Sequence, residues 1–273
     1  VLAAASWHRD PKSLQGSSFT PYQSLFEPGS IVEPLVLGYA HEVGALDWEH
    51  VYDCRGHDRH GVDYEKTIRP LGRRKPVVDD HHCDDLSAHG IIVNSSNIGA
   101  ALIGLQLERE QWHDYMQGYG FGASLGLNLP YESIGGHNPR SFAADIPLRS
   151  FRANSAISFS FGYELSVTTM QVARAYLRLF RGMGAELRLC RGLELAGEFH
   201  TVPPRRDTGP QLRREVVEAV RAAMVDVISS DQHATGFYMH RDMLNETGID
   251  LHGLIGGKTG TAASLVGIGG GVL

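Results

Sequence analysis

Residues 27–34 read EPGSIVEP, and the apolar run LVLGYA follows at once. The Pro-Gly pair followed by an apolar run predicts that Ser30 is presented at the start of a helix, which we expect to extend to about Gly44. Pro34 is tolerated near the first turn, where backbone N–H groups have no intrahelical partner. Glu33 lies three residues after Ser30 and therefore on the same helical face.

The 273 residues suit one large domain or two small ones, and a hydrophobic content of 42% allows a sizeable core. The formal net charge of −6 argues against a nucleic-acid partner, which requires a basic face. Three scattered cysteines, Cys54, Cys83 and Cys190, are too few for a disulfide framework. The sequence opens on VLAAAS without Met and closes on GIGGGVL, so we expect a piece of a longer protein, incomplete at both ends.

Three further helices are predicted from apolar spacing, with strands at both ends of the chain and loops or short elements over residues 47–90. The second helix should run from about Ser96 to Gln117. The third should begin at a Ser166 or Thr168 cap, after a long loop that passes Pro139, Pro147 and Gly162. The fourth should begin near Thr208 and Pro210. The expected buried stripes are Met170, Ala173, Leu177 and Phe180 in the third helix, and Leu212, Val216, Val220, Met224 and Val227 in the fourth.

Three short motifs occur in the order of a known serine-acylating set, Ser-x-x-Lys, a Ser-x-Asn-type element and Lys-Thr-Gly. The first motif contains Ser30. The second is Ser95-Ser96-Asn97, at the start of a predicted helix. The third is Lys258-Thr259-Gly260, followed by Thr261, in a glycine-rich segment that we expect to be a strand. Each motif alone arises often by chance. Their order and context together favour an acyl-transfer site.

Longer segments around these motifs resemble the class B, or high-molecular-weight, penicillin-binding proteins of the cell-division or elongation type. FEPGSIVEP is similar to their FEPGS-x-x-KP segment. Four later segments of this chain are similar to later segments of the same proteins: VNSSNIGAALIG, YGFGASLGLNLPYESIG, SFSFGYELSVTTMQVARAYLRLF and GLIGGKTGTA. The resemblance extends from about Val1 to Ala262. It implies an α/β (α+β) fold of the β-lactamase and transpeptidase type over 1–273, with an antiparallel sheet flanked by helices and a mostly helical part at roughly 30–183.

The resemblance also implies a role for each motif residue. Ser30 would attack the peptide bond between two D-alanines of a peptidoglycan stem peptide, or a β-lactam, and the N–H groups of Ser30 and Thr261 would form the oxyanion hole. Ser95 would pass a proton to the leaving amine. Asn97 would hold the substrate amide, and Lys258, Thr259, Gly260 and Thr261 would bind the terminal carboxylate. It implies no cofactor and no metal, a place at the outer face of the cytoplasmic membrane, and other cell-wall synthesis proteins as partners.

Glu33 departs from this pattern, because the resemblance places a lysine three residues after the serine. A serine hydroxyl is a poor nucleophile until a neighbouring base accepts its proton. A carboxylate can serve as that base only if burial raises its pKa, whereas pairing with Lys258 would lower it. Two functions therefore remain open: a transpeptidase whose catalysis is impaired by Glu33, and a non-catalytic module that binds peptidoglycan or division proteins.

Three other features have simpler interpretations. Cys54, His57, His60, His81, His82 and Cys83 are potential zinc ligands, but their spacing fits no standard site and a solvated loop is favoured. GLIGGKTGT lacks the first glycine of a phosphate-binding loop, because His252 stands there. Arg213, Arg214 and Arg221 lie opposite the apolar stripe of the fourth helix and are expected to be solvated.

Overall fold

The computed structural model describes residues 20–55, 76–127, 129, 131–137, 153–189, 192–201, 211–261 and 263–264. In chain order, the helices are η2 (Thr20–Tyr22), η3 (Gly29–Val32), α1 (Glu33–Glu42), α2 (Ala88–Asn94), α3 (Asn97–Gly104), α4 (Arg109–Tyr119), α5 (Ala153–Ser160), α6 (Thr169–Arg181), α7 (Arg214–Asp226) and α8 (Phe237–Thr247). The strands are β1 (Phe26–Glu27), β2 (Val51–Asp53), β3 (Asp85–Ser87), β4 (Gly136–His137), β5 (Leu165–Ser166), β6 (Gly192–Leu195), β7 (Glu198–Thr201) and β8 (Ala263–Ser264).

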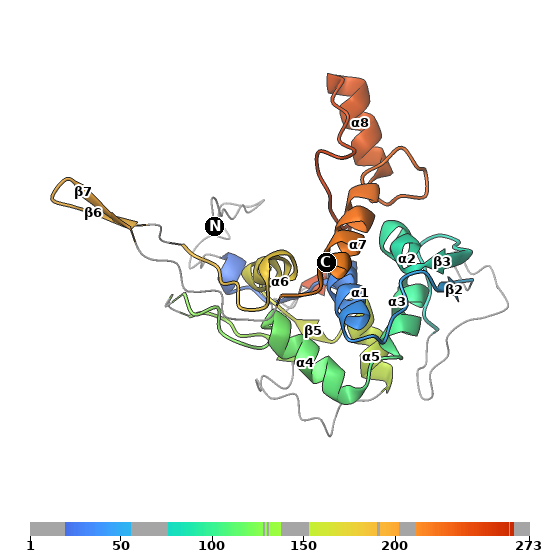
Figure 1. Cartoon of the computed structure of the whole chain (residues 1–273), viewed down its shortest axis with the longest axis horizontal. Helices are drawn as coiled ribbons and strands as arrows, with labels where there is room; N and C mark the ends of the chain where they lie inside the picture. The colour runs from blue at the N-terminus through green and yellow to red at the C-terminus, as the bar shows by residue number, and fades with distance from the viewer. Residues whose placement is uncertain are drawn as a thin grey trace, which may run out of the picture.

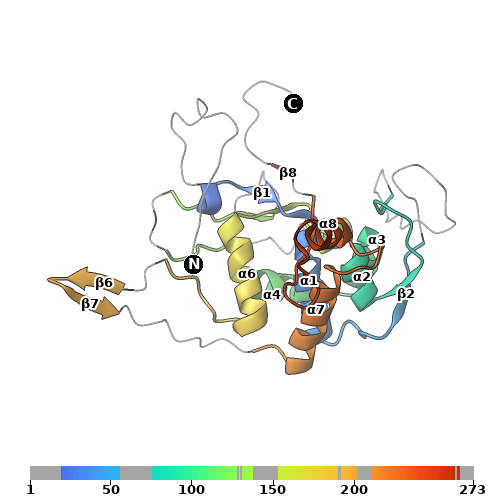
Figure 2. The same cartoon turned by 90° about the horizontal axis from the view of Figure 1, so that it is seen from above.

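Helix α1 is the centre of the helical core, with α2, α3, α6 and α7 around it (Figures 1 and 2). Every residue from Glu33 to Ala40 is buried, as expected for a helix that is apolar on all sides. Gly38 allows the closest approach, because a Cβ there would lie 3.2 Å from Val220 of α7 and 3.3 Å from Leu179 of α6. The predicted helix after Ser30 is therefore confirmed, with a 3₁₀ turn before it and Pro34 in its first turn.

The strands form short ladders, and all four of the described ladders are antiparallel. β1 pairs with β8 through Phe26↔Ser264 and Glu27↔Ala263. On its other side, Phe26 exchanges two backbone hydrogen bonds of 3.0 Å with Val167, which follows β5. β5 in turn pairs with β4. Antiparallel strands covered by helices confirm the expected fold class, and the segment that leads into Ser30 is held between two others.

Two helices begin or end elsewhere than predicted. The stretch expected as one helix from Ser96 to Gln117 is two, α3 and α4, because Glu108 starts a new helix with a capping box: its N–H donates to Gln111 Oε1 at 2.8 Å. The apolar spacing hides this break, since Leu107 and Trp112 on either side of it are both buried. α7 begins at Arg214, and Thr208 and Pro210 lie outside the described residues, as does the strand expected at VLAAAS.

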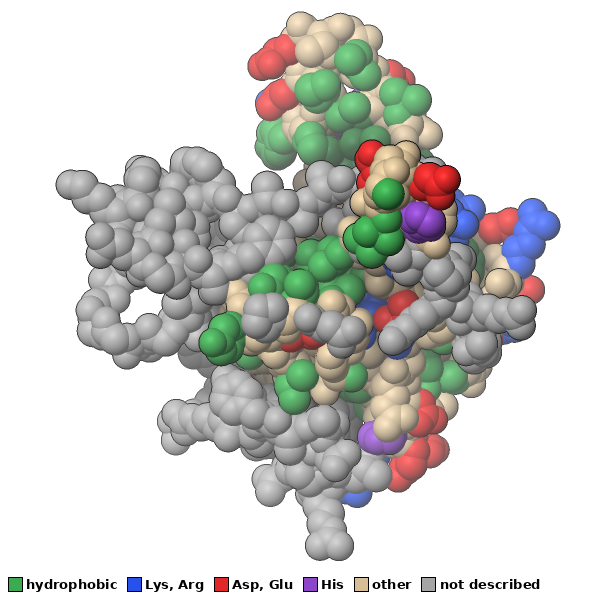
Figure 3. Space-filling model, turned by 90° about the vertical axis from the view of Figure 1, so that its left-hand side faces the viewer, with side chains coloured by type: hydrophobic (Ala, Val, Ile, Leu, Met, Phe, Trp, Pro, Cys, Tyr) green, Lys and Arg blue, Asp and Glu red, His purple; other side chains and the backbone are tan. Residues whose placement is uncertain are grey.

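Three other predictions are wrong in part. α5 occupies part of the expected long loop, and α8 was not predicted. Among the described residues of the expected C-terminal strand, only Ala263–Ser264 forms a strand, and Lys258–Thr261 is irregular. In the stripe of α7, by contrast, Val216, Val220 and Val227 are fully buried, as predicted. α8 projects from the body with Tyr238, Met239 and Leu244 exposed, and hydrophobic side chains gather on this lobe in Figure 3.

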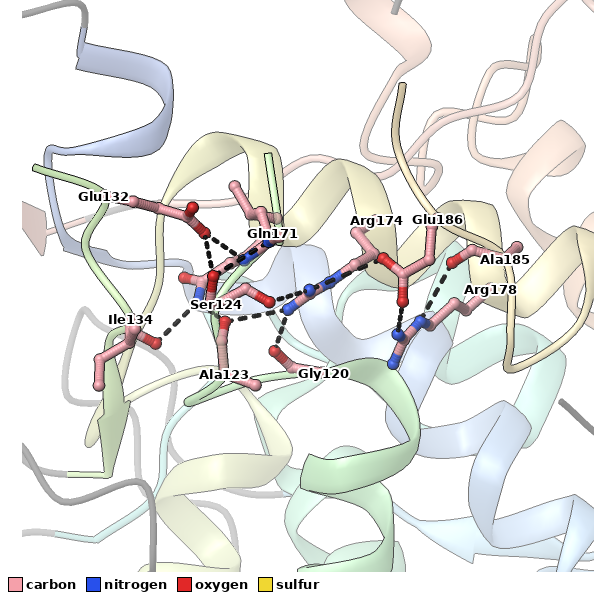
Figure 4. A network of polar contacts seen from close by, with 12 residues as sticks. Gly120, Ala123, Ser124, Glu132, Ile134, Gln171, Arg174, Arg178, Ala185 and Glu186 are labelled. Carbon is pink, nitrogen blue, oxygen red and sulfur yellow. Dashed lines mark hydrogen bonds and ion pairs between the residues drawn. The ribbon is translucent and has the colours of Figure 1, made fainter. Parts of the chain in front are cut away.

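The buried face of α6 is partly polar, which the predicted stripe missed. Ala173 is exposed, whereas Gln171 is fully buried and Arg174 is 2% exposed. Arg174 donates to the carbonyls of Gly120, Ala123 (3.2 Å) and Ser124 (2.6 Å), and Gln171 donates to those of Ala123 (3.0 Å) and Ile134 (2.7 Å) (Figure 4). These side chains satisfy loop carbonyls that would otherwise be buried without donors. Thr168 caps the helix, as predicted.

Candidate active site

Three distant segments touch at Gly29, the residue before Ser30. Gly29 has φ +61°, and a Cβ on it would lie 2.1 Å from the carbonyl oxygen of Thr261. Its N–H donates to the Gly162 carbonyl at 3.2 Å, and a Cβ on Gly162 would lie 2.1 Å from the Gly29 carbonyl oxygen. Only glycine allows both the positive φ and this contact. Ser30, which is partly exposed, is therefore presented beside the Lys258–Thr261 segment.

Glu33 is the residue where the three sequence motifs meet. Its side chain is fully buried, and its Oε2 lies 3.2 Å from Lys258 Nζ, whose side chain is 1% exposed. The Ser95 hydroxyl donates to the Glu33 carboxylate at 3.4 Å and accepts from Lys258 Nζ at 2.6 Å. A single buried cluster thus contains one residue from each motif. The pairing of Glu33 with Lys258 was anticipated from the sequence.

Burial raises the pKa of Glu33 from 4.5 to about 7. The positive charge of Lys258 and a hydrogen bond from Ser30 act in the opposite direction, and they offset only part of the desolvation. Glu33 therefore combines a contact with the Ser30 hydroxyl and a pKa near neutral pH. Those are the two properties that a general base needs, although the same carboxylate also occupies Lys258.

We expect this burial to appear in the pH dependence of stability. The folded pKa of Glu33 lies above its ordinary value of 4.5, so the folded state binds this proton more tightly than the unfolded chain. The resulting stabilisation is complete below pH 4.5 and is lost as the pH rises through about 7, a change of about 3 kcal/mol. Urea unfolding at pH 5, 6, 7 and 8 measures it. The free energy of unfolding of Glu33→Gln should no longer fall over this pH range, whereas that of the exposed control Glu49→Gln should fall as in the wild-type protein. An equal pH dependence in the wild-type protein and both variants would contradict the prediction.

Ser95 and Asn97 are positioned by the junction of α2 and α3. Ser95 ends α2 in a left-handed conformation, φ 55°, ψ 50°, which is uncommon for a residue with a side chain. Ser96 caps α3 by accepting from the Gly99 N–H at 3.0 Å. The Asn97 side-chain nitrogen donates to the Val78 carbonyl at 2.8 Å, so part of this amide is already bound within the protein.

Asp79 supports this junction, and the sequence reasoning assigned it no role. It is 2% exposed, accepts from Ser96 Oγ at 2.7 Å and accepts from the Ile98 N–H at 3.1 Å. Burial raises its pKa, and these hydrogen bonds offset part of the shift. Asp79 belongs to an acidic, His-rich stretch whose composition resembles a solvated loop, so only its position directly before the Ser-Ser-Asn motif could have indicated it.

The Lys258–Thr261 segment lies across the first turn after Gly29. A Cβ on Gly260 would be 3.0 Å from the Ile31 nitrogen, and Thr259, Gly260 and Thr261 are exposed. The segment is attached to the end of α7 by a 2.9 Å hydrogen bond from the Gly257 N–H to the Met224 carbonyl. The predicted site residues of the third motif are therefore brought beside Ser30, with Lys258 pointing inward and the others facing solvent.

In its described part, the Cys- and His-rich stretch matches the predicted solvated loop only partly: His82 is exposed, but the two cysteines are not. Cys54 and Cys83 are both buried in the main core, and burial raises the pKa of the Cys54 thiol to about 12. His57 and His60 lie outside the described residues. Within the described part of the chain, no three His, Cys, Asp or Glu side chains form a group that could hold a metal ion.

Comparison with known proteins adds an independent line of evidence. The family described as the penicillin binding protein transpeptidase domain matches residues 1–271. A probable peptidoglycan D,D-transpeptidase, PbpC of Pseudomonas aeruginosa, is 33% identical over 152 residues, which are 55% of this chain and 23% of that protein. Another, PenA of Neisseria gonorrhoeae, is 28% identical over 243 residues, 89% of this chain and 35% of that protein. The chain thus spans well under half the length of either relative.

Solved structures share the fold. A structure described as a peptidoglycan glycosyltransferase from Burkholderia ambifaria superimposes with a TM-score of 0.62, covering 81% of this chain and 61% of that one at 23% identity. The transpeptidase domain of penicillin-binding protein 3 from Burkholderia pseudomallei gives 0.56, covering 78% and 56% at 24% identity. None of the described helices is both long and apolar enough to cross a membrane.

Proposed function

Because the chain belongs to the penicillin-binding protein transpeptidase family, we propose that it is a D,D-transpeptidase domain of peptidoglycan synthesis whose catalysis is impaired by Glu33. The observation that carries this proposal is the contact of all three motifs, in which Glu33 and Lys258 pair at 3.2 Å and Ser95 bonds both. The substrate would be a peptidoglycan stem peptide, and β-lactams would react at the same serine.

Each step of the proposed reaction uses a residue from the three motifs. Ser30 Oγ attacks the carbonyl between the two terminal D-alanines as its proton passes to Glu33. The N–H groups of Ser30 and Thr261 stabilise the oxyanion. The carbon–nitrogen bond then breaks, and D-alanine leaves with a proton supplied through Ser95. An amine of a neighbouring stem peptide attacks the acyl-serine, forms the cross-link and returns a proton to Ser30 Oγ. Asn97 would hold the peptide amide throughout.

Glu33 interferes with the activation of Ser30 and with the binding of substrate. Its ion pair with Lys258 lowers its basicity, which weakens the activation of Ser30. The same pair also occupies the ammonium that would bind the terminal carboxylate of the substrate, alongside Thr259, Gly260 and Thr261. An internal carboxylate thus takes the place of the substrate carboxylate. The weakened activation of Ser30 favours the second candidate function, a non-catalytic module that binds peptidoglycan or other cell-wall synthesis proteins.

The cellular setting is proposed from the family alone. We place the domain on the outer side of the cytoplasmic membrane, where peptidoglycan is assembled, carried by parts of a longer protein. The related PenA of Neisseria gonorrhoeae and FtsI of Escherichia coli are named as peptidoglycan D,D-transpeptidases.

Acylation by benzylpenicillin tests the proposal directly. Intact-mass spectrometry after long incubation should show one penicilloyl adduct on the protein, none on Ser30→Ala, and a normal adduct on the control Ser24→Ala. An adduct that persists in Ser30→Ala would exclude Ser30 as the nucleophile. No adduct on the folded wild-type protein, together with an adduct on Glu33→Lys, would select the non-catalytic module instead.

A further inference from the structure

The C-terminal end of α6 and the N-terminal end of α7 form an open cavity that the proposed reaction does not use. Its volume is about 580 Å³, within the size range of sites for small molecules. It is lined by the last residues of α6, including Leu179 and Phe180, and by the start and first turns of α7, from Gln211 to Arg221. Ser30 lies just before the N-terminal end of α1, whereas Arg213, between the lining residues Leu212 and Arg214, donates to the His41 carbonyl at the C-terminal end of that helix. Helices α6 and α7 both pack against α1 (Figures 1 and 2).

The charge around this cavity is positive, although the chain as a whole carries −6. Three arginines, Arg181, Arg214 and Arg221, line it against one carboxylate, Glu218. Glu218 is already bonded to Arg214 Nε at 2.6 Å. Among the described residues, neither Arg181 nor Arg221 makes an ion pair. The cavity therefore presents two guanidinium groups, one from each helix, with no carboxylate partner among the residues that the structure describes.

One of these arginines is held in place, and the floor beneath them is apolar. The Arg221 guanidinium stacks over the Phe180 ring, 5.5 Å from its centroid, an arrangement that fixes its direction. The accessible apolar surface of this floor comes from Phe180 and Val217, which are partly exposed, because Leu179 and Leu212 are only 1% and 9% exposed. The arginines of α7 are thus exposed to solvent, as expected, but Arg214 and Arg221 also line a concave surface together with Arg181 of α6.

We propose that this cavity binds a phosphate ester whose phosphate is attached to an apolar group. Guanidinium groups match the paired oxygens of a phosphate, and two of them balance a dianion. The apolar floor would receive the attached group. The same chemistry could come from a soluble phosphate monoester or from a lipid headgroup at a bilayer, and the experiment separates the two sources.

Isothermal titration with phenyl phosphate should show saturable binding at one site, and inorganic phosphate should bind more weakly because it lacks the apolar group. The double variant Arg181→Gln/Arg221→Gln should weaken phenyl phosphate binding about 30-fold, roughly fivefold for each guanidinium. Arg241→Gln is the matched control: Arg241 also stacks on aromatic rings, but it pairs with Asp242 at 2.7 Å and does not line the cavity. All the substituted arginines are exposed, so the variants should keep the wild-type thermal midpoint.

Co-sedimentation with phosphatidylcholine vesicles, with and without phosphatidic acid, distinguishes the sources. Binding that requires phosphatidic acid, is competed by phenyl phosphate and is lost in the double variant assigns the phosphate to a lipid. Phenyl phosphate binding without vesicle binding assigns it to a soluble ester. The proposal is overturned if phenyl phosphate does not saturate, if the double variant binds it like Arg241→Gln, or if benzoate binds more tightly. None of these outcomes depends on Ser30, so they are independent of the proposed transpeptidase function.

Discussion

Glu33→Lys should increase the rate of benzylpenicillin acylation at Ser30 by about 10²- to 10⁴-fold, the usual contribution of a well-matched general base. In the present site, the carboxylate that contacts Ser30 is also paired with Lys258 at 3.2 Å. An introduced amine would sit beside Lys258 in a fully buried position. Two ammonium groups so close cannot both stay charged, and the neutral amine would be a free base next to the serine.

The measurement is the rate of adduct formation, followed by intact mass over time for both proteins. Glu49→Lys is the matched control, because it makes the same change of charge at an exposed glutamate outside the site and should leave the rate unaltered. Glu33→Gln, which has no basic group, should react no faster than the wild-type protein. If Glu33→Lys folds, as judged by urea unfolding, and still reacts at the wild-type rate, the glutamate is not what limits catalysis.

Lys258→Met should lower the free energy of unfolding by about 3 kcal/mol at pH 8. The substitution leaves Glu33 fully buried without its counter-charge, and the Ser95 hydroxyl loses the donor 2.6 Å away. Because the charge of Lys258 lowers the pKa of Glu33, removing it raises that pKa further. At pH 5.5 Glu33 would be protonated, so the loss should be clearly smaller there than at pH 8.

A double variant separates the ion pair from general damage to the core. Glu33→Leu/Lys258→Met replaces both charges with apolar groups of similar size and should recover most of the lost stability, since buried ion pairs are often no better than apolar contacts. Urea unfolding of the wild-type protein, Glu33→Leu, Lys258→Met and the double variant completes the cycle. The two side chains are not coupled if Lys258→Met lowers the free energy of unfolding equally at both pH values. The same conclusion follows if the double variant loses as much unfolding free energy as the two single variants together.

Features that depend on neighbouring residues are predictable from the sequence, whereas features that depend on distant contacts are not. Helix α1, the Thr168 cap of α6 and the inner stripe of α7 were predictable, because caps and apolar spacing act within a few residues. The break between α3 and α4 was not, because Leu107 and Trp112 continue the apolar spacing across it. Arg174 and Gln171 were not recognised as buried, because their partners are carbonyls in a distant loop.

The sequence by itself determined the family motifs, their order, and the departure at Glu33, since these depend only on which residues stand where. The tertiary structure decided that Glu33 is fully buried with a pKa near 7, that Asp79 supports the Ser-Ser-Asn junction, and that Arg181 and Arg221 line one cavity. Burial and charge pairing depend on groups that are far apart in the chain and meet only in the folded protein, so they cannot be obtained from local sequence patterns.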